Sequence, residues 1–173
     1  NTTFDVGKIE IRNSKSDAID LDFSKGRIEN LICTNIGNDC FDISESNVEL
    51  EHIDASNVLD KIISAGENSI LKVKDVNAKN SEIAIVSKDG SSIKLSTLKL
   101  FDVRLAIAAF RKKSEYNLPK LNISVIQGKA NFTGLVDPKS TFILPKDYEI
   151  TFVESEKIEN LMYGNEFGRK TLK

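Results

Sequence analysis

The chain has 173 residues, enough to bury a hydrophobic core in one domain, and 40% of them are hydrophobic. Its 24 basic and 26 acidic residues are interspersed and leave a net charge of −2, so we predict no basic face for nucleic acid or an anionic membrane. No apolar stretch is long enough to span a bilayer, so we expect no membrane partner either.

A repeat organises the sequence from Val6 to Asp102. Its turn column consists of Asn13, Asn35, Asn57, Asn80 and Asp102, at spacings of 22, 22, 23 and 22 residues. Apolar residues stand seven, four and two positions before each member of this column. The column four positions before it consists of Ile9, Leu31, Ile53, Val76 and Leu98. Several columns in one register over five repeats indicate a true structural repeat.

The period and the polarity pattern together favour strands over helices. Apolar and polar residues alternate before each turn column, and the period is too short for most two-helix repeats. The consensus of a leucine-rich repeat is missing. We therefore predict coils of short strands that stack about 4.8 Å apart, with Asn at the turns because Asn tolerates the left-handed conformation. Stacked Asn amides can bond from coil to coil as a ladder.

This pattern resembles the right-handed parallel β-helix of the pectin-lyase-like superfamily, which includes pectin-degrading enzymes, surface proteins and tailspikes. The resemblance implies an all-β fold, a right-handed parallel β-helix (solenoid) of about six coils with an Asn ladder. We place the coils in residues 1–130. The connecting turns lengthen along the chain, and the longest, Arg111–Lys120, is expected to protrude. In the sixth coil, Ala130 takes the ladder position.

Residues 131–173 lose the period and are predicted to cap the end of the solenoid within the same domain. Strands are expected over 142–144 and 148–153. Ser155 is predicted to N-cap a short helix that ends at Gly164 and places Ile158, Leu161 and Met162 on one face. A capping segment is expected because the last coil of a solenoid exposes core and strand edge.

Cys33, Cys40 and His52 have simple structural interpretations. Cys33 and Cys40 occupy apolar columns and read as small core residues, while a disulfide across the turn between them remains an alternative. His52 is the only histidine and is expected to point outward near a turn, without partners for a metal site.

Four aspartates form the densest carboxylate group of the repeats. Asp17 and Asp39 share one column one coil apart, and Asp20 and Asp42 share another. Stacked carboxylates could serve as the acid and base of a glycosidase, or could bind calcium weakly. The simpler interpretation is that they face solvent on a turn and are screened. We predict no metal site and no other cofactor.

The aspartate segments resemble those of polygalacturonases. Asp17 matches the first catalytic aspartate of that family. Asp39 and Cys40 match the second aspartate of its Asp-Asp-Cys segment, while Asn38 replaces the first. This match implies the Asp17/Asp39 region as the catalytic site of a polysaccharide hydrolase or lyase.

The rest of the polygalacturonase set departs from this sequence. Asp60 and Lys61 stand where that family has a histidine, and the only Arg-x-Lys lies two coils further on, at Arg111–Lys113. Loss of cooperating catalytic groups removes most of the rate. The sequence therefore favours a non-catalytic protein, with the enzyme as the alternative.

The segments DAIDLD and NDCFDIS also resemble β-helices without known activity. Such modules can follow a spore-coat-type kinase domain in bacterial surface proteins, and the ending ENLMYGNEFGRK resembles the tails of that arrangement. The chain opens without Met or a signal peptide, so we expect a piece of a larger protein. The resemblance implies an extracellular or cell-surface location.

We therefore predict a surface scaffold that binds carbohydrate. Its partner is expected to be a polysaccharide or a neighbouring domain of the larger protein. The candidate ligand-binding residues are Asp17, Asp20, Asp39, Asp42, Arg111, Lys112 and Tyr116.

Overall fold

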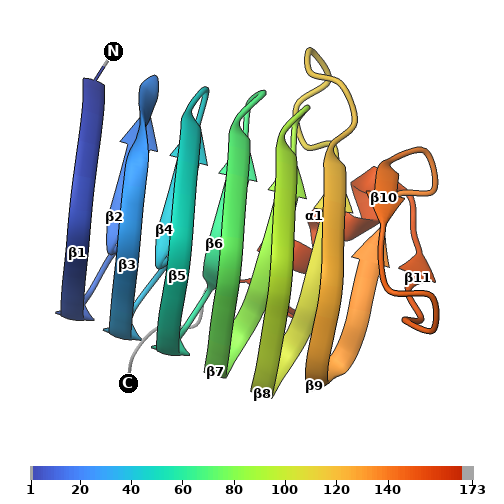
Figure 1. The fold of residues 1–173 in the computed structure, drawn as a ribbon. Helices are drawn as coiled ribbons and strands as arrows, with labels where there is room; N and C mark the ends of the chain where they lie inside the picture. The colour runs from blue at the N-terminus through green and yellow to red at the C-terminus, as the bar shows by residue number, and fades with distance from the viewer. Residues whose placement is uncertain (1, 169–173) are drawn as a thin grey trace.

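The computed structural model describes residues 2–168, which fold into a parallel β-solenoid of about six coils (Figure 1). The long strands form one face, which we call the front face. Its strands are β1 (Thr2–Ser14), β3 (Ser24–Ile36), β5 (Asn47–Val58) and the first parts of β7 (Ile70–Lys88), β8 (Ser92–Phe110) and β9 (Lys120–Val136).

The second face, which we call the back face, is built from the shorter strands. It consists of β2 (Ile19–Asp22), β4 (Phe41–Ser44), β6 (Lys61–Gly66) and the second parts of β7, β8 and β9. Every pairing between coils is parallel, so each residue lies beside the residue at the equivalent position of the preceding coil. No helix among residues 2–168 has the length and apolar character needed to cross a membrane.

The core runs along the solenoid axis between the two faces. Leu31 pairs in register with Ile53, Ile53 with Val76, and Val76 with Leu98. All four side chains are fully buried. This confirms the predicted core column four positions before the turn asparagines.

The turn column has the backbone conformation that favours asparagine. Asn13, Asn35, Asn57, Asn80 and Asp102 have φ angles of 59°, 57°, 55°, 45° and 53°. Asn35 Nδ2 donates to Asn13 Oδ1 at 2.8 Å, and Asn57 Nδ2 donates to Asn35 Oδ1 at the same distance. The three side chains are exposed, so this ladder lies along an outer corner and not in the core.

We expect Asn57→Ala to lower the free energy of unfolding by about 1–2 kcal/mol, because alanine is strained at positive φ and the ladder loses a hydrogen bond. Urea denaturation measures this cost. Asn77→Ala is the control, since Asn77 Nδ2 donates to Asp54 Oδ1 at 2.6 Å from a strand position without positive φ. If the two variants lose the same free energy of unfolding, the ladder asparagine does not stabilise the fold through its left-handed backbone conformation.

The sixth coil turns earlier than the sequence indicates. Gly128 lies opposite Leu100, and Ala130 lies opposite Val103, with a register shift between these pairs. Ala130 therefore occupies the column after the ladder, and its predicted ladder position is wrong. Gly128 has a φ of 84°, and a Cβ there would lie 2.0 Å from the carbonyl oxygen of Leu100, so this tighter turn requires glycine.

Beyond the coils the chain returns across the end of the core. Strand β9 continues to Val136, past the predicted coil boundary, and β10 (Thr141–Ile143) and β11 (Thr151–Phe152) both pair with it. Phe142, Leu144, Tyr148 and Ile150 pack against the main core. The first strand lies within one residue of its predicted place, and the second is confirmed only at Thr151–Phe152 of the predicted range 148–153. Both strands cover the core at the C-terminal end of the solenoid.

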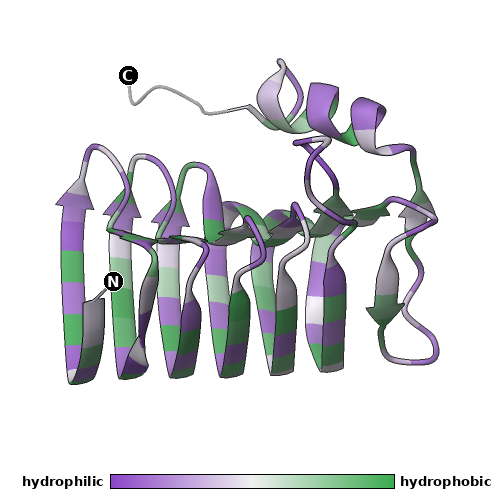
Figure 2. Cartoon of the chain, turned by 90° about the horizontal axis from the view of Figure 1, so that it is seen from above, coloured by the Kyte–Doolittle hydropathy of each residue, from purple (hydrophilic) through white to green (hydrophobic). Residues whose placement is uncertain are grey.

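Helix α1 (Ser155–Tyr163) lies against the outside of the back face, beside β8 and β9 (Figure 2). Its buried Ile158 and Met162, with Phe167, pack on outward-facing residues of the strands, which are Ile83, Val86, Leu105, Ala108, Phe110 and Leu135. The predicted N-cap at Ser155 is wrong, because Glu154 holds that position and Ser155 begins the helix. The Ser155 hydroxyl is bonded to Asp137 Oδ2 at 2.5 Å instead.

Candidate functional site

The outward side of the back face changes character along the solenoid axis. Coils one and two present Asp17, Asp20, Asp22, Asp39 and Asp42. Coils four and five present the apolar residues that α1 covers. Coil three lies between these halves with Lys61 and Ser64. The back face is therefore acidic in the N-terminal coils and apolar in the later coils, where α1 packs on it.

Asp17 and Asp39 are brought together one coil apart, and both bind the coil that follows. Asp17 Oδ1 accepts from Asp39 N at 2.8 Å and from Asn38 Nδ2 at 2.6 Å. Asp39 Oδ1 accepts from Lys61 N at 2.9 Å. Each carboxylate thus satisfies a backbone N–H of the next coil, which is a structural role for the column that the sequence proposes as catalytic.

Asp39, Asp60 and Lys61 form a buried ionic triad. Their exposed fractions are 4%, 6% and 3%. Lys61 Nζ lies 3.3 Å from Asp39 Oδ1 and 2.7 Å from Asp60 Oδ2. Asp60 Oδ1 is buried and accepts no hydrogen bond from any of residues 2–168. One ammonium group therefore serves two buried carboxyl groups.

The protonation of the triad follows from this imbalance. Burial raises the pKa of Asp39 to about 7, against the attraction of Lys61 and with added repulsion from Asp60 and Asp42. Burial also raises the pKa of Asp60. For Lys61, burial alone would lower the pKa, but the charges of Asp39 and Asp60 outweigh it and raise the pKa above the usual range. Near neutral pH the lysine is charged and the two acids compete for it.

Asp20 and Asp42 lie opposite each other on β2 and β4, as the sequence predicts. Partial burial raises the pKa of Asp20, and the charges of Asp42, Asp22 and Asp17 add to the effect. Within residues 2–168 no three His, Cys, Asp or Glu side chains converge in the way that a metal ion requires. The negative charges of these aspartates therefore repel one another on the outside of the back face. Of Asp17, Asp20, Asp39 and Asp42, only Asp39 is deeply buried.

The loop after β8 carries the predicted basic and aromatic candidates and reaches beyond the other turns in Figure 1. Its backbone is held by Asp89 Oδ1, which accepts from Lys112 N and Lys113 N at 2.7 Å each. Arg111 N donates to Ser155 Oγ at 2.9 Å. The Tyr116 hydroxyl bonds to Glu45 Oε1 at 3.2 Å, so the loop lies back across the turns of earlier coils.

Tyr163 of α1 connects this loop to the triad. Lys112 Nζ lies 4.2 Å from the centroid of the Tyr163 ring, and Lys61 Nζ lies 5.7 Å from it. Two ammonium groups thus contact one aromatic ring. Of the predicted loop candidates, Lys112 contacts the Tyr163 ring, Arg111 N donates to Ser155, and Tyr116 bonds to Glu45, so the three do not form one site among residues 2–168.

The two cysteines form a disulfide. Cys33 and Cys40 are fully buried, and their Cα atoms lie 6.0 Å apart. Both cysteines lie in the core, as the sequence predicts, and the alternative of a disulfide across the turn is correct. The two columns meet because the chain turns back between them, at the corner where β3 leads towards β4.

His52 lies in the middle of β5 and not near a turn. Its Nδ1 lies 3.0 Å from Asp75 Oδ2 on the neighbouring β7, and both side chains are partly exposed. The pair is a cross-strand contact on the front face. It stands on the opposite face from the aspartates of β2 and β4.

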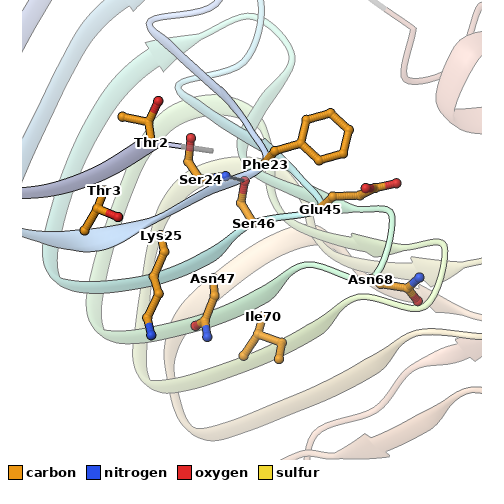
Figure 3. Close-up of a pocket in the computed structure, with 10 residues that line it drawn as sticks. All are labelled: Thr2, Thr3, Phe23, Ser24, Lys25, Glu45, Ser46, Asn47, Asn68 and Ile70. Atoms are coloured by element: carbon orange, nitrogen blue, oxygen red, sulfur yellow. Dashed lines mark hydrogen bonds between the residues drawn. The ribbon is translucent and has the colours of Figure 1, made fainter.

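A groove that the sequence does not predict follows the corner between the back and front faces (Figure 3). It encloses about 580 Å³, and its lining residues are Thr2, Thr3, Phe23, Ser24, Lys25, Glu45, Ser46, Asn47, Asn68 and Ile70. Figure 3 shows Lys25, Asn47 and Ile70 in a row on successive coils. A second hollow of about 560 Å³ shares Thr3, Lys25 and Asn47 and extends the groove onto the front face.

The floor of this corner is a column of serines. Ser24, Ser46, Ser69 and Ser91 each lie one coil apart, and all four are buried. Ser24 N donates to Ser46 Oγ at 2.9 Å, and Ser46 N donates to Ser69 Oγ at 3.2 Å. The hydroxyl groups satisfy the backbone where each coil turns, which fixes the shape of the groove above them.

No known protein family, curated protein or solved structure matches this chain. Its function therefore has to be inferred from the fold and these surfaces. Of the tail segment ENLMYGNEFGRK, the last two residues, Arg169 and Lys170, lie outside the described residues.

Proposed function

We propose that this protein is a non-catalytic β-helix scaffold of the pectin-lyase-like type that binds a polysaccharide along the corner groove. In this proposal it is a surface or extracellular module of a larger protein, in the manner of the β-helices that follow spore-coat-type kinase domains. The observation that carries it is the groove itself, which runs along the solenoid axis over successive coils.

The lining of the groove suits a linear sugar polymer. An extended chain along the axis meets side chains from the same columns once per coil, and these include Lys25 and Asn47 as hydrogen-bonding groups. Phe23 is 53% exposed at the groove and offers an aromatic face for a sugar ring. Tyr116, a candidate from the sequence, contacts the groove residue Glu45.

Two further observations support a non-catalytic surface protein. One oxygen of each carboxylate, Oδ1 of Asp17 and Oδ1 of Asp39, accepts hydrogen bonds from N–H groups of the next coil, and Asp39 is only 4% exposed. The Cys33–Cys40 disulfide is the kind of bond that persists in oxidising compartments, which supports a location outside the cytoplasm.

Phe23→Ala tests the groove. We expect it to weaken binding of a soluble oligosaccharide, found on a glycan array, by about tenfold, the loss that corresponds to about 1.4 kcal/mol. Isothermal titration calorimetry measures the affinity. Phe101→Ala is the matched control, because Phe101 is 68% exposed on the front face away from the groove. An equal loss in both variants, or no glycan bound by the parent protein, would contradict the proposal.

The alternative function is a polysaccharide hydrolase or lyase that uses Asp17 and Asp39. One observation favours it: the pKa of Asp39 is raised to about 7 by burial, and a general acid must keep its proton near neutral pH. Release of reducing or unsaturated ends from acidic and neutral polysaccharides tests it. If the protein is an enzyme, Asp39→Asn should abolish that release while the protein stays folded. If it is a non-catalytic scaffold, the parent protein should release no such ends.

A further inference from the structure

The N-terminal end of the solenoid is open. In the first coil, Val6, Ile9 and Ile11 are only partly buried, although they belong to core columns. Their partners one coil on are Ile28, Leu31 and Cys33, with exposed fractions of 1%, 0% and 0%. Among residues 2–168, strand β1 pairs with β3 alone, whereas the last coil is covered by β10 and β11. A long apolar strand edge is thus left unpaired at one end only.

The polar ladders show which way this edge continues. Asn13 accepts a hydrogen bond from Asn35, and its own Nδ2 donates to none of residues 2–168. In the column four positions after the ladder, Asp39 N and Lys61 N each donate to the aspartate of the coil before. The equivalent donor, Asp17 N, has no such acceptor in the described part of the chain. Both free donors therefore face the position of a preceding coil.

We propose that the open face of the first coil is a docking surface for one more coil of the same repeat, which the larger protein supplies immediately before β1. This coil would place apolar residues over Val6, Ile9 and Ile11, an asparagine over Asn13 and an acceptor over Asp17. The inference deepens the proposed function, since it rests on its statement that the chain is a module of a larger protein.

The same geometry excludes a second copy as the occupant. A head-to-tail copy would have to offer its last coil, which β10 and β11 cover. A head-to-head copy related by a two-fold axis would present its β1 in the antiparallel direction. Asn13 of one copy would then not lie over Asn13 of the other, and neither ladder could continue. Only a parallel coil accepts both free donors.

An added coil tests this surface. A copy of residues 24–45 placed directly before Thr2, in place of Asn1, sets its asparagine 22 residues before Asn13, in register. Hydrogen exchange is measured on the parent and the extended chain. In the parent we expect amides of β1 to exchange at least about tenfold faster than those of β3, as for an unsupported edge. In the extended chain we expect β1 to slow by about tenfold or more, with a higher Tm.

The control is an extended chain in which the added copy, and only the copy, carries the substitutions Ile28→Ser, Leu31→Ser and Ile43→Ser. In this control we expect the exchange rates of β1 and the Tm to equal those of the parent. Three results would overturn the proposal. These are unchanged β1 exchange in the extended chain, β1 protection equal to that of β3 in the monomeric parent, and a parent dimer that protects β1. The parent measurement decides even if the extended chain aggregates. None of these results involves oligosaccharide binding, so failure of the groove proposal is recognised separately.

Discussion

Replacing Ile53 with alanine is expected to lower the free energy of unfolding by about 2–5 kcal/mol, one of the two largest effects of any single substitution here. Ile53 is fully buried in β5 and stacks between Leu31 and Val76 of the neighbouring coils. Removing three carbon atoms leaves a cavity that the stacked coils cannot close, because strand spacing is fixed by backbone hydrogen bonds. Urea denaturation at neutral pH measures the loss.

Ile143→Ala is the control for this prediction. Ile143 lies on β10 and is 62% exposed, so the same chemical change there should cost less than about 1 kcal/mol. If Ile53→Ala costs no more than Ile143→Ala, the inward direction of the column four positions before the ladder is wrong, and with it the register of every coil.

The fold could be predicted because a solenoid repeats its own environment. Each coil needs inward apolar residues at the same places, so the sequence shows the same columns five times over. The turn asparagines follow for the same reason, since every coil must pass through one left-handed residue. Periodicity ends where the environment changes. The ladder position predicted for Ala130 in the sixth coil is therefore wrong, because a glycine turn replaces the asparagine turn there.

The serine column is a periodic sequence signal for the groove that hydropathy does not reveal. Ser24, Ser46, Ser69 and Ser91 stand eleven positions before the ladder residues in four successive repeats. Polar residues between strands are ordinarily assigned to exposed turns, but these are buried because their hydroxyls bond the backbone at a corner. A search for conserved spacing within the chain, without regard to hydropathy, finds them and with them the groove.

The candidate site was predictable only in part. Spacing alone placed Asp39 over Asp17 and Asp42 over Asp20. It did not predict that Lys61 would be buried with Asp39, because the ring of Tyr163 that lies near Lys61 comes from a tail outside the repeat. Neither could the repeat predict the partners of Tyr116, which bonds to a turn three coils earlier. Contacts between a repeat and a non-repeating segment leave no periodic trace.

The second large effect is expected at Lys61. Lys61→Met removes the only ammonium group within ion-pair distance of Asp39 and Asp60 among the described residues, while keeping a side chain of similar length. Two carboxyl groups then remain buried without a counter-charge, and we expect a loss of about 3–5 kcal/mol near neutral pH. Lys72→Met is the matched control. Lys72 pairs with Glu49 at 2.7 Å, but its side chain is 60% exposed, so about 1 kcal/mol or less should be lost.

The pH dependence separates a lost counter-charge from a merely altered shape. The pKa of Asp39 in the folded protein, about 7, lies above the value of about 3.9 expected in the unfolded chain. Its contribution to stability is therefore complete below about pH 4 and is lost as the pH rises through about 7, because the unfolded chain releases the proton first. Without Lys61 the pKa of Asp39 and that of Asp60 should rise further. The deficit of Lys61→Met, measured by urea denaturation, should thus be small near pH 4 and grow towards pH 8, whereas that of Lys72→Met should stay small. A deficit equal at both pH values would mean that Lys61 stabilises the back face by packing alone.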